Sequence, residues 1–149
     1  MAKKTFHGRP ILSGKLEGQA TVSRIGLNTL STYKAVMFGG VKDKAVCSDG
    51  DNKELYGKDI TGAILCLPQT IGSSSSSSLL LTMAEQGLGP KAWLFANHID
   101  SLAAGGLVMA DVWLEKRSVT VDLLGDEFLE AVKTGDPVKV HADGTVEVG

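Results

Sequence analysis

Two short segments of the chain, 60–67 and 92–96, are apolar at almost every position. Their length and the turn residues around them predict strands that are buried on both faces of a sheet. Segments 136–141 and 145–148 instead alternate apolar and polar residues, and an Ala-Asp-Gly turn at 142–144 separates them. This arrangement predicts a β-hairpin.

Four further segments have the pattern of extended chain. Residues 19–25 alternate, which predicts a strand with one exposed face. Residues 34–38 form a short apolar run that two glycines stop, and we expect a second strand there. Residues 108–113 and 118–121 are also expected to be extended.

Helices are predicted at three places. Apolar residues at helical spacing follow six serines, 73–78, so a helix is expected to begin within the serines and to end at Gly87. Residues 98–104 predict a short helix that a Gly-Gly pair at 105–106 interrupts. Residues 126–133 are amphipathic and predict a turn or two of helix.

The order of these elements predicts the class of fold. Strands come first, then strand–helix–strand–helix, then strands again. We therefore expect an α/β fold with barrel-like sheet layers and short helices packed outside them. The 149 residues suit a single domain spanning 1–149.

Composition narrows the classes of partner. The net charge of −2 gives no basic surface for nucleic acid, so no nucleic-acid partner is expected. The longest uncharged stretch, 60–83, is broken by Pro68 and six serines and does not predict a membrane span. No apolar segment follows the basic N-terminus, so no signal peptide is predicted and a cytoplasmic location is expected.

Two isolated cysteines cannot complete a metal site by themselves. Cys66 lies in the apolar segment 60–67 and is expected to be a small core residue. Cys47 lies in the polar stretch 42–58, which predicts a surface loop, and is a candidate for exposure. We expect this chain to bind no metal or cofactor of its own.

The serine run is the most informative feature. A flexible linker is not expected between a buried strand and an apolar helix, and an N-cap explains one serine of the six. A strand, a glycine turn and a helix start bring N–H groups and hydroxyls around one point, where the helix dipole favours an anion. Gly72 lets the backbone approach a ligand closely. We expect a site for a carboxylate, a phosphate or a serine alkoxide.

Other catalytic motifs are missing from the sequence. The serine run lacks the lysine of a phosphate-binding loop, and no G-x-S-x-G motif occurs. His98 is expected to cap a helix or to lie on the surface, with a role as a base as the alternative. His141 is expected in solvent beside the hairpin turn, and His7 lies near the N-terminus.

Four segments together resemble one family from end to end. Segment 7–20, HGRPILSGKLEGQA, is similar to the opening motif of the aconitase X swivel domain. Segments 38–41, FGGV, and 55–65, LYGKDITGAIL, are similar to its next two motifs. Segment 68–74, PQTIGSS, is similar to its P-x-x-R-G-S-S motif.

The resemblance implies a swivelling β/β/α domain that is the small subunit of a hydro-lyase and is inactive alone. By motif, Ser73 would be the catalytic base, and Gly72, Ser74 and Ser75 would bind the substrate. The partner would be a large subunit that carries iron or an iron–sulfur cluster. The substrate would be a small-molecule β-hydroxy acid such as cis-3-hydroxy-L-proline, with mevalonate 5-phosphate as the alternative.

One residue departs from the family motif. Ile71 stands where the family has arginine, a residue that would grip an anion with two hydrogen bonds. Its absence disfavours a phosphate-bearing substrate more than a simple hydroxy acid. Two other classes remain open: a non-catalytic anion-binding or regulatory module, and a phosphohistidine swivel domain, for which the loop would need a histidine where serines stand.

Overall fold

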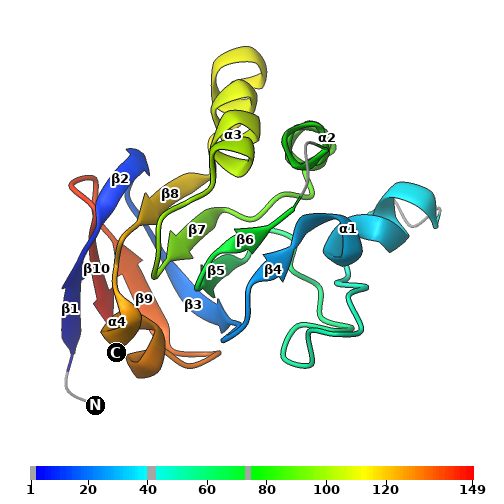
Figure 1. Ribbon diagram of the computed structural model, residues 1–149. Coiled ribbons are helices and arrows are strands. Elements are labelled where there is room, and N and C mark those ends of the chain that lie inside the picture. The colour runs from blue at the N-terminus through cyan, green and yellow to red at the C-terminus, as the bar shows by residue number, and fades with distance from the viewer. Residues whose placement is uncertain (1–2, 40–42, 73–74) are drawn as a thin grey trace.

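A computed structural model describes residues 3–39, 43–72 and 75–149 of the chain (Figure 1). Its strands are β1 (Lys4–His7), β2 (Arg9–Leu12), β3 (Leu16–Val22), β4 (Leu27–Asn28), β5 (Ile64–Leu67), β6 (Thr70–Ile71), β7 (Ala92–Phe95), β8 (Val119–Asp122), β9 (Pro137–Val140) and β10 (Thr145–Val148). Its helices are α1 (Thr29–Phe38), α2 (Ser76–Glu85), α3 (Ser101–Leu114) and α4 (Asp126–Ala131).

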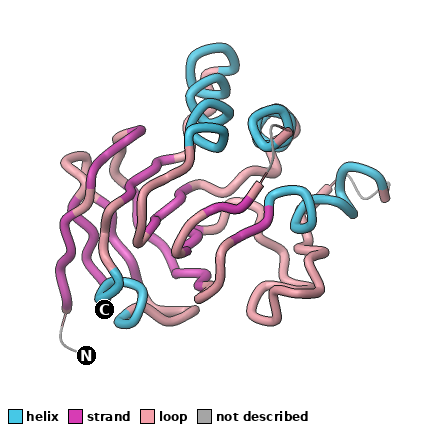
Figure 2. Tube along the Cα trace, in the orientation of Figure 1, coloured by secondary structure: helices cyan, strands magenta, loops and turns pink. Residues whose placement is uncertain are grey.

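The main sheet has the strand order β1-β10-β9-β3-β5-β7-β8-β2. Its two edge strands, β1 and β2, are consecutive in the chain with Gly8 between them, so the sheet curls into a nearly closed barrel. Strands β3, β5, β7 and β8 run parallel, whereas the remaining pairs are antiparallel. Figure 2 shows helices α1, α2 and α3 together on one side and α4 at the other end of the strands. The predicted α/β class with a barrel-like sheet and outer helices is confirmed.

The two fully apolar segments form the central strands β5 and β7, as predicted. On β5, Leu65 and Leu67 join the cluster that packs against the helices, whereas Ile64 and Cys66 join the cluster inside the barrel. Strand β7 alternates in the same way, with Trp93 on the helix side. Both faces of these strands are therefore covered, which explains why their sequences do not alternate. The predicted hairpin is confirmed as β9 and β10, and the helix predicted over 126–133 as α4.

The strand predicted over 34–38 is wrong, because these residues belong to α1. The Asn28 side chain caps this helix by accepting a hydrogen bond of 3.0 Å from the Ser31 N–H. Tyr33 and Val36 are buried beneath it. Cap and packing together outweigh the weak strand preference of a five-residue apolar run.

The break predicted at 105–106 is also wrong, as is the extended segment predicted over 108–113. Helix α3 runs without interruption through both segments. A Cβ atom on Gly106 would lie 2.7 Å from the Ser77 carbonyl oxygen, so the two helix backbones meet at this glycine. Gly106 thus allows close packing of α3 on α2, and the pair does not end the helix.

The segment from 43 to 62 lies partly in the core, although the sequence predicts a surface loop over 42–58. Ala45, Leu55 and Ile60 are fully buried. Cys47 is only 1% exposed, so the expectation that it is exposed is wrong, and burial raises the pKa of its thiol. Cys66 is buried as predicted, and burial raises its thiol pKa as well.

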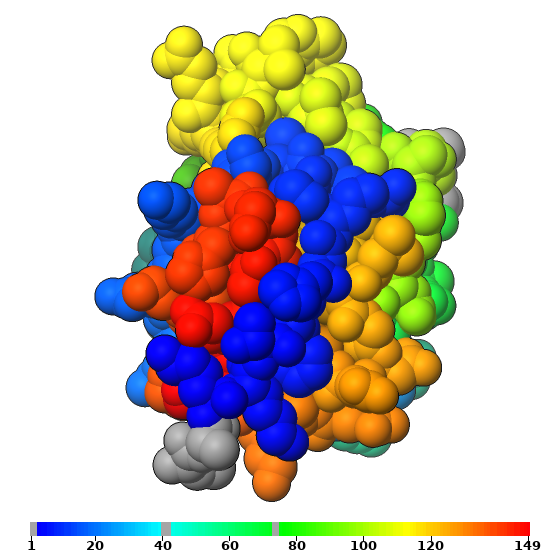
Figure 3. All heavy atoms as spheres, turned by 90° about the vertical axis from the view of Figure 1, so that its left-hand side faces the viewer, coloured from blue at the N-terminus to red at the C-terminus, as the bar shows by residue number. Residues whose placement is uncertain are grey.

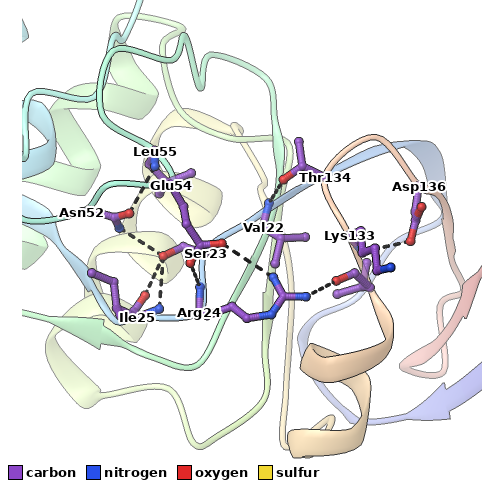
Figure 4. A network of polar contacts seen from close by, with 11 residues as sticks. Val22, Ser23, Arg24, Ile25, Asn52, Glu54, Leu55, Lys133, Thr134 and Asp136 are labelled. Atoms are coloured by element: carbon purple, nitrogen blue, oxygen red, sulfur yellow. Dashed lines mark hydrogen bonds and ion pairs between the residues drawn. The ribbon is translucent and has the colours of Figure 1, made fainter.

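A polar network joins this segment to the end of β3 (Figure 4). The buried Asn52 amide donates to the Ser23 hydroxyl over 3.1 Å. The Arg24 N–H donates to the Glu54 carboxylate over 2.6 Å, and the Arg24 guanidinium donates to the Val132 carbonyl at the end of α4 over 2.7 Å. These bonds fix the segment against the barrel without regular secondary structure.

An ion pair fastens the closing strand β2 to β8. The Arg9 guanidinium donates two hydrogen bonds, of 2.9 and 2.7 Å, to the fully buried carboxylate of Asp122. Burial alone would raise the pKa of Asp122, but the bonds from Arg9 and from the Ile99 N–H outweigh it and hold the pKa below its usual value. The Ile99 bond also ties the start of the α3 region to the barrel.

The contact between α2 and α3 predicts opposite effects for two neighbouring glycines. Gly106→Ala should lower the free energy of unfolding by about 1–3 kcal/mol, because the added Cβ meets backbone. Gly105→Ala should raise it by about 1 kcal/mol, because its Cβ would lie an ordinary 3.6 Å from the Ser77 hydroxyl and alanine favours a helix. Urea denaturation of both variants measures the difference, and equal effects would contradict the packing described.

Candidate functional site

Two short parallel strands bring two helix starts to one edge of the molecule. Strand β4 pairs with β6 in parallel, and each leads into a helix, α1 after β4 and α2 after β6. Because paired parallel strands run in the same direction, the two helices begin side by side (Figure 1). The hydroxyl oxygens of Thr29 and Ser76, the first residues of the two helices, lie 2.8 Å apart in a buried hydrogen bond.

Gly72 packs directly on this hydroxyl pair. A Cβ atom there would lie 1.9 Å from the Ser76 oxygen and 2.8 Å from the Thr29 oxygen. Ser76 is buried and held by its bond to Thr29, so it cannot move aside for a larger side chain. Glycine is therefore required where the chain leaves β6 for the serine run, for a packing reason that the sequence analysis did not anticipate.

The start of α3 is attached to the same edge. Asp100 caps α3 by accepting a hydrogen bond of 2.8 Å from the Ala103 N–H, and it also accepts one from the Thr70 hydroxyl on β6. The Ser77 hydroxyl donates to the Leu102 carbonyl. Three helix N-termini are thus linked by side chains from the strands and helices that meet there.

The electrostatics of this edge favour a bound anion. The first turns of α1 and α2 contain no acidic side chain, so the positive ends of their dipoles are not offset within those turns. Ser75 occupies the N-cap position of α2 with a helical backbone, and its side chain does not make the capping bond that Asn28 and Asp100 make. An anion that approaches the loop between Gly72 and Ser75 meets the start of α2.

The predicted site residues are only partly described. Ser73 and Ser74 lie outside the described residues, so the structure does not test their roles. Gly72 and Ser75 are exposed and flank them, and α2 begins within the serine run as predicted. Ser76 and Ser77 have structural bonds that the sequence analysis did not anticipate. The partners of these bonds, on α1 and α3, are distant in sequence and give no local signal.

Each of the three histidines has its own contacts in the structure. His98 is exposed just before α3 and its Nδ1 contacts the Ile99 carbonyl, in line with the surface role expected of it. His141 is half-buried rather than in free solvent, with its Nε2 2.6 Å from the Glu147 carboxylate across the hairpin. His7 lies on β1, with its Nδ1 3.2 Å from the Thr145 hydroxyl.

The described residues do not fit an iron centre. Among residues 3–39, 43–72 and 75–149, no group of three or more His, Cys, Asp or Glu side chains could hold a metal ion. Both cysteines are buried in the core.

Within the same ranges, no helix has the length and hydropathy needed to span a membrane.

A barrel-like sheet with three helix starts and a serine loop at one edge is the architecture of a swivel domain. The aconitase X swivel domain family matches residues 5–148, and the chain belongs to that family.

Relatives and a solved structure agree with this assignment. The chain is 34% identical over 144 residues to the phosphomevalonate dehydratase small subunit of Archaeoglobus fulgidus, covering 96% of this chain and 97% of that protein. It is 28% identical over 146 residues to the cis-3-hydroxy-L-proline dehydratase of Hypocrea jecorina, covering 97% of this chain and 23% of that protein. The crystal structure of holo-form aconitase X from Thermococcus kodakaraensis matches with a TM-score of 0.80 and 28% identity, covering 98% of each chain.

Two serines of the run should differ in their effect on stability. Ser76→Ala removes the buried bond to Thr29 and leaves that hydroxyl without this partner, so unfolding should become easier by about 1–2 kcal/mol. Ser78→Ala, at an exposed helical position, should be neutral or stabilising by a few tenths of a kcal/mol (roughly the alanine advantage). Thermal unfolding followed by circular dichroism compares them. A neutral Ser76→Ala variant would rule out the hydroxyl pair as a structural bond.

Proposed function

We propose that this chain is the small subunit of an aconitase-X-type hydro-lyase that dehydrates a β-hydroxy acid. Membership of the swivel-domain family supports the class of enzyme, and the dehydratase names of its relatives support the reaction. The observation that carries the proposal is the serine loop at an edge where three helix starts are linked. Such an edge can bind the carboxylate of an acid substrate.

In this proposal Ser73 is the base. Its alkoxide oxygen accepts the proton on the carbon α to the carboxylate, and the electrons of that C–H bond form the new C=C bond. The C–O bond of the β-hydroxyl breaks and releases hydroxide. This hydroxide and the proton held by Ser73 together make one water per turnover. The dipole of α2 and the N–H groups at its start favour the alkoxide over the neutral hydroxyl.

Gly72, Ser74 and Ser75 bind the substrate carboxylate through backbone N–H groups and hydroxyls. Gly72 has the role with the most direct support, because its packing on the Ser76 hydroxyl fixes where the loop begins. The described residues on either side of the loop, Gly72 and the N-cap residue Ser75, lie at the start of α2, where N–H donors are available. Fixed donors are what electrostatic stabilisation of a developing charge needs.

The active site is completed by a large subunit, and the small subunit alone is inactive. This chain corresponds to 23% of the fungal dehydratase, so most of that enzyme lies outside the matching region. The iron or iron–sulfur centre that the family resemblance implies is assigned to the large subunit, since the described residues of this chain offer no ligand cluster.

The side chain of Ile71 affects which substrate we expect the enzyme to prefer. It is 48% exposed at the end of β6, directly before the loop, and it lies against the backbone of Gly26. An apolar side chain at this position suits a compact hydroxy acid such as cis-3-hydroxy-L-proline, because it offers no partner for a phosphate. The alternative substrate, mevalonate 5-phosphate, is favoured by the names of the archaeal relatives.

Replacing the proposed base, Ser73, should slow turnover strongly. Ser73→Ala, co-expressed with the large subunit, should lower kcat for dehydration of the preferred substrate by about 10²–10⁴-fold with little change in KM. Ser78→Ala is the matched control within the same run and should retain wild-type kcat. Full activity of the Ser73→Ala enzyme would refute the serine base. A complex inactive on both substrates in its wild-type form would refute the assigned reaction.

Substitution at position 71 should change the choice of substrate. Ile71→Arg should raise kcat/KM for mevalonate 5-phosphate relative to cis-3-hydroxy-L-proline by about 10-fold or more, the effect of one charge-assisted contact. Ile71→Met keeps an apolar side chain of similar size and should leave the ratio unchanged. The measurement is kcat/KM for both substrates with each complex. A wild-type enzyme that already prefers the phosphate would favour the alternative substrate.

A further inference from the structure

Helix α3 is unusually apolar for a helix on the outside of a protein. Its 14 residues include a single charged side chain, Asp111. The Arg117 guanidinium donates two hydrogen bonds of 2.8 Å to this carboxylate, so even this charge is paired. A helix with this composition is ordinarily covered on all sides.

One side of α3 is covered within the chain. Ala103, Gly106, Leu107 and Ala110 are buried and fall on one arc of the helix at about 100° per residue. This arc faces α2, with Gly106 at the closest approach.

A neighbouring side of α3 is only partly covered within the described residues, and its side chains are 38–70% exposed. It consists of Leu102, Val108, Val112 and Trp113, which we call the α3 face. Val112 is 65% exposed and Trp113 is 70% exposed. At about 100° per residue these four side chains share one arc roughly 140° wide. Figure 3 shows the second half of α3 as a yellow lobe standing above the strands.

A group of exposed apolar side chains that includes a tryptophan is typical of an interface. Tryptophan is among the residues that contribute most when buried between proteins, because one rigid side chain removes a large area from water. Glu115, Lys116 and Arg117 follow directly after the α3 face and are exposed, which supplies a polar rim at its far end.

We propose that the α3 face binds an apolar groove of the large subunit and so holds the serine loop at the shared active site. This inference rests on the proposed function. Two observations support the large subunit as the partner that binds the α3 face. The Ser77 hydroxyl bonds the Leu102 carbonyl, so the α3 face begins where the serine run ends, and a partner that covers the loop reaches it. The chain corresponds to 23% of the fungal dehydratase, so in that protein the matching region is part of the same polypeptide as the remaining length.

The test measures affinity of the full-length chain for the purified large subunit. Trp113→Glu and Val112→Glu should each raise Kd by about 30-fold or more, because a charge would enter an apolar groove. Phe38→Glu is the matched control, since Phe38 is 74% exposed and lies at the end of α1. It should change Kd by less than about 3-fold. Unchanged thermal unfolding of all three variants establishes that folding is not the cause.

A spectroscopic readout tests the same contact directly. The chain has two tryptophans, of which Trp93 is fully buried and Trp113 is exposed. With 5-fluorotryptophan incorporated in this chain alone, addition of the large subunit should shift the ¹⁹F signal of Trp113 and leave that of Trp93 nearly in place. Trp113→Phe assigns the signals.

The outcomes separate the two proposals. Normal binding by Trp113→Glu, with no shift of the Trp113 signal, overturns the α3 face as the interface and leaves the two-subunit enzyme intact. A wild-type chain that does not bind the large subunit overturns the proposed function, and this inference with it. A Trp113 signal that instead shifts with concentration of the free chain would identify self-association and also overturn the proposal.

Discussion

The parallel pairing of β4 with β6, completed by the hydroxyl bond between Thr29 and Ser76, is the contact on which the candidate site depends. It forces two helices to begin side by side and excludes any side chain larger than hydrogen at Gly72. Without it, the loop that follows β6 would have no fixed relation to the helix dipoles. The site is therefore organised by small polar side chains beneath the surface rather than by the residues proposed to react.

The serines of the run 73–78 have two different roles, one in packing and one in the proposed chemistry. Ser76 and Ser77 join α2 to α1 and α3, which needs short hydroxyl side chains because the helices approach closely. Ser75, directly before them, is exposed. One repeated residue type thus serves both packing and the proposed chemistry, since serine is small enough for the first and polar enough for the second.

The sequence predicts the parts of the fold that are marked by an uninterrupted apolar run, by an alternating pattern or by clear turns. Strands β5 and β7, the hairpin β9–β10 and the start of α2 were all accessible in this way. Only the start of α3 was predicted, because the Gly-Gly pair reads as a stop and a helix that is apolar on both faces has no periodic pattern to detect beyond it. Helix α1 was also missed, because its cap is a single local hydrogen bond from Ser31 to Asn28 and its buried residues do not stand out as an amphipathic pattern. The hydrogen bonds to Thr29 and Asp100 at the site also join residues that are distant in sequence, so no local motif predicts them.

The closure of the barrel by β1 and β2 has a consequence for how such a domain can be combined with other chains. Strand β1 pairs with β10, with Lys4 opposite Val148, so the described residues near both ends of the domain lie together at the barrel, on the side away from α1, α2 and α3 (Figure 1). A linker to another polypeptide can leave from there without crossing the helix starts. The same architecture can accordingly serve as a separate subunit or as a fused segment, with the edge at the helix starts left open in either arrangement.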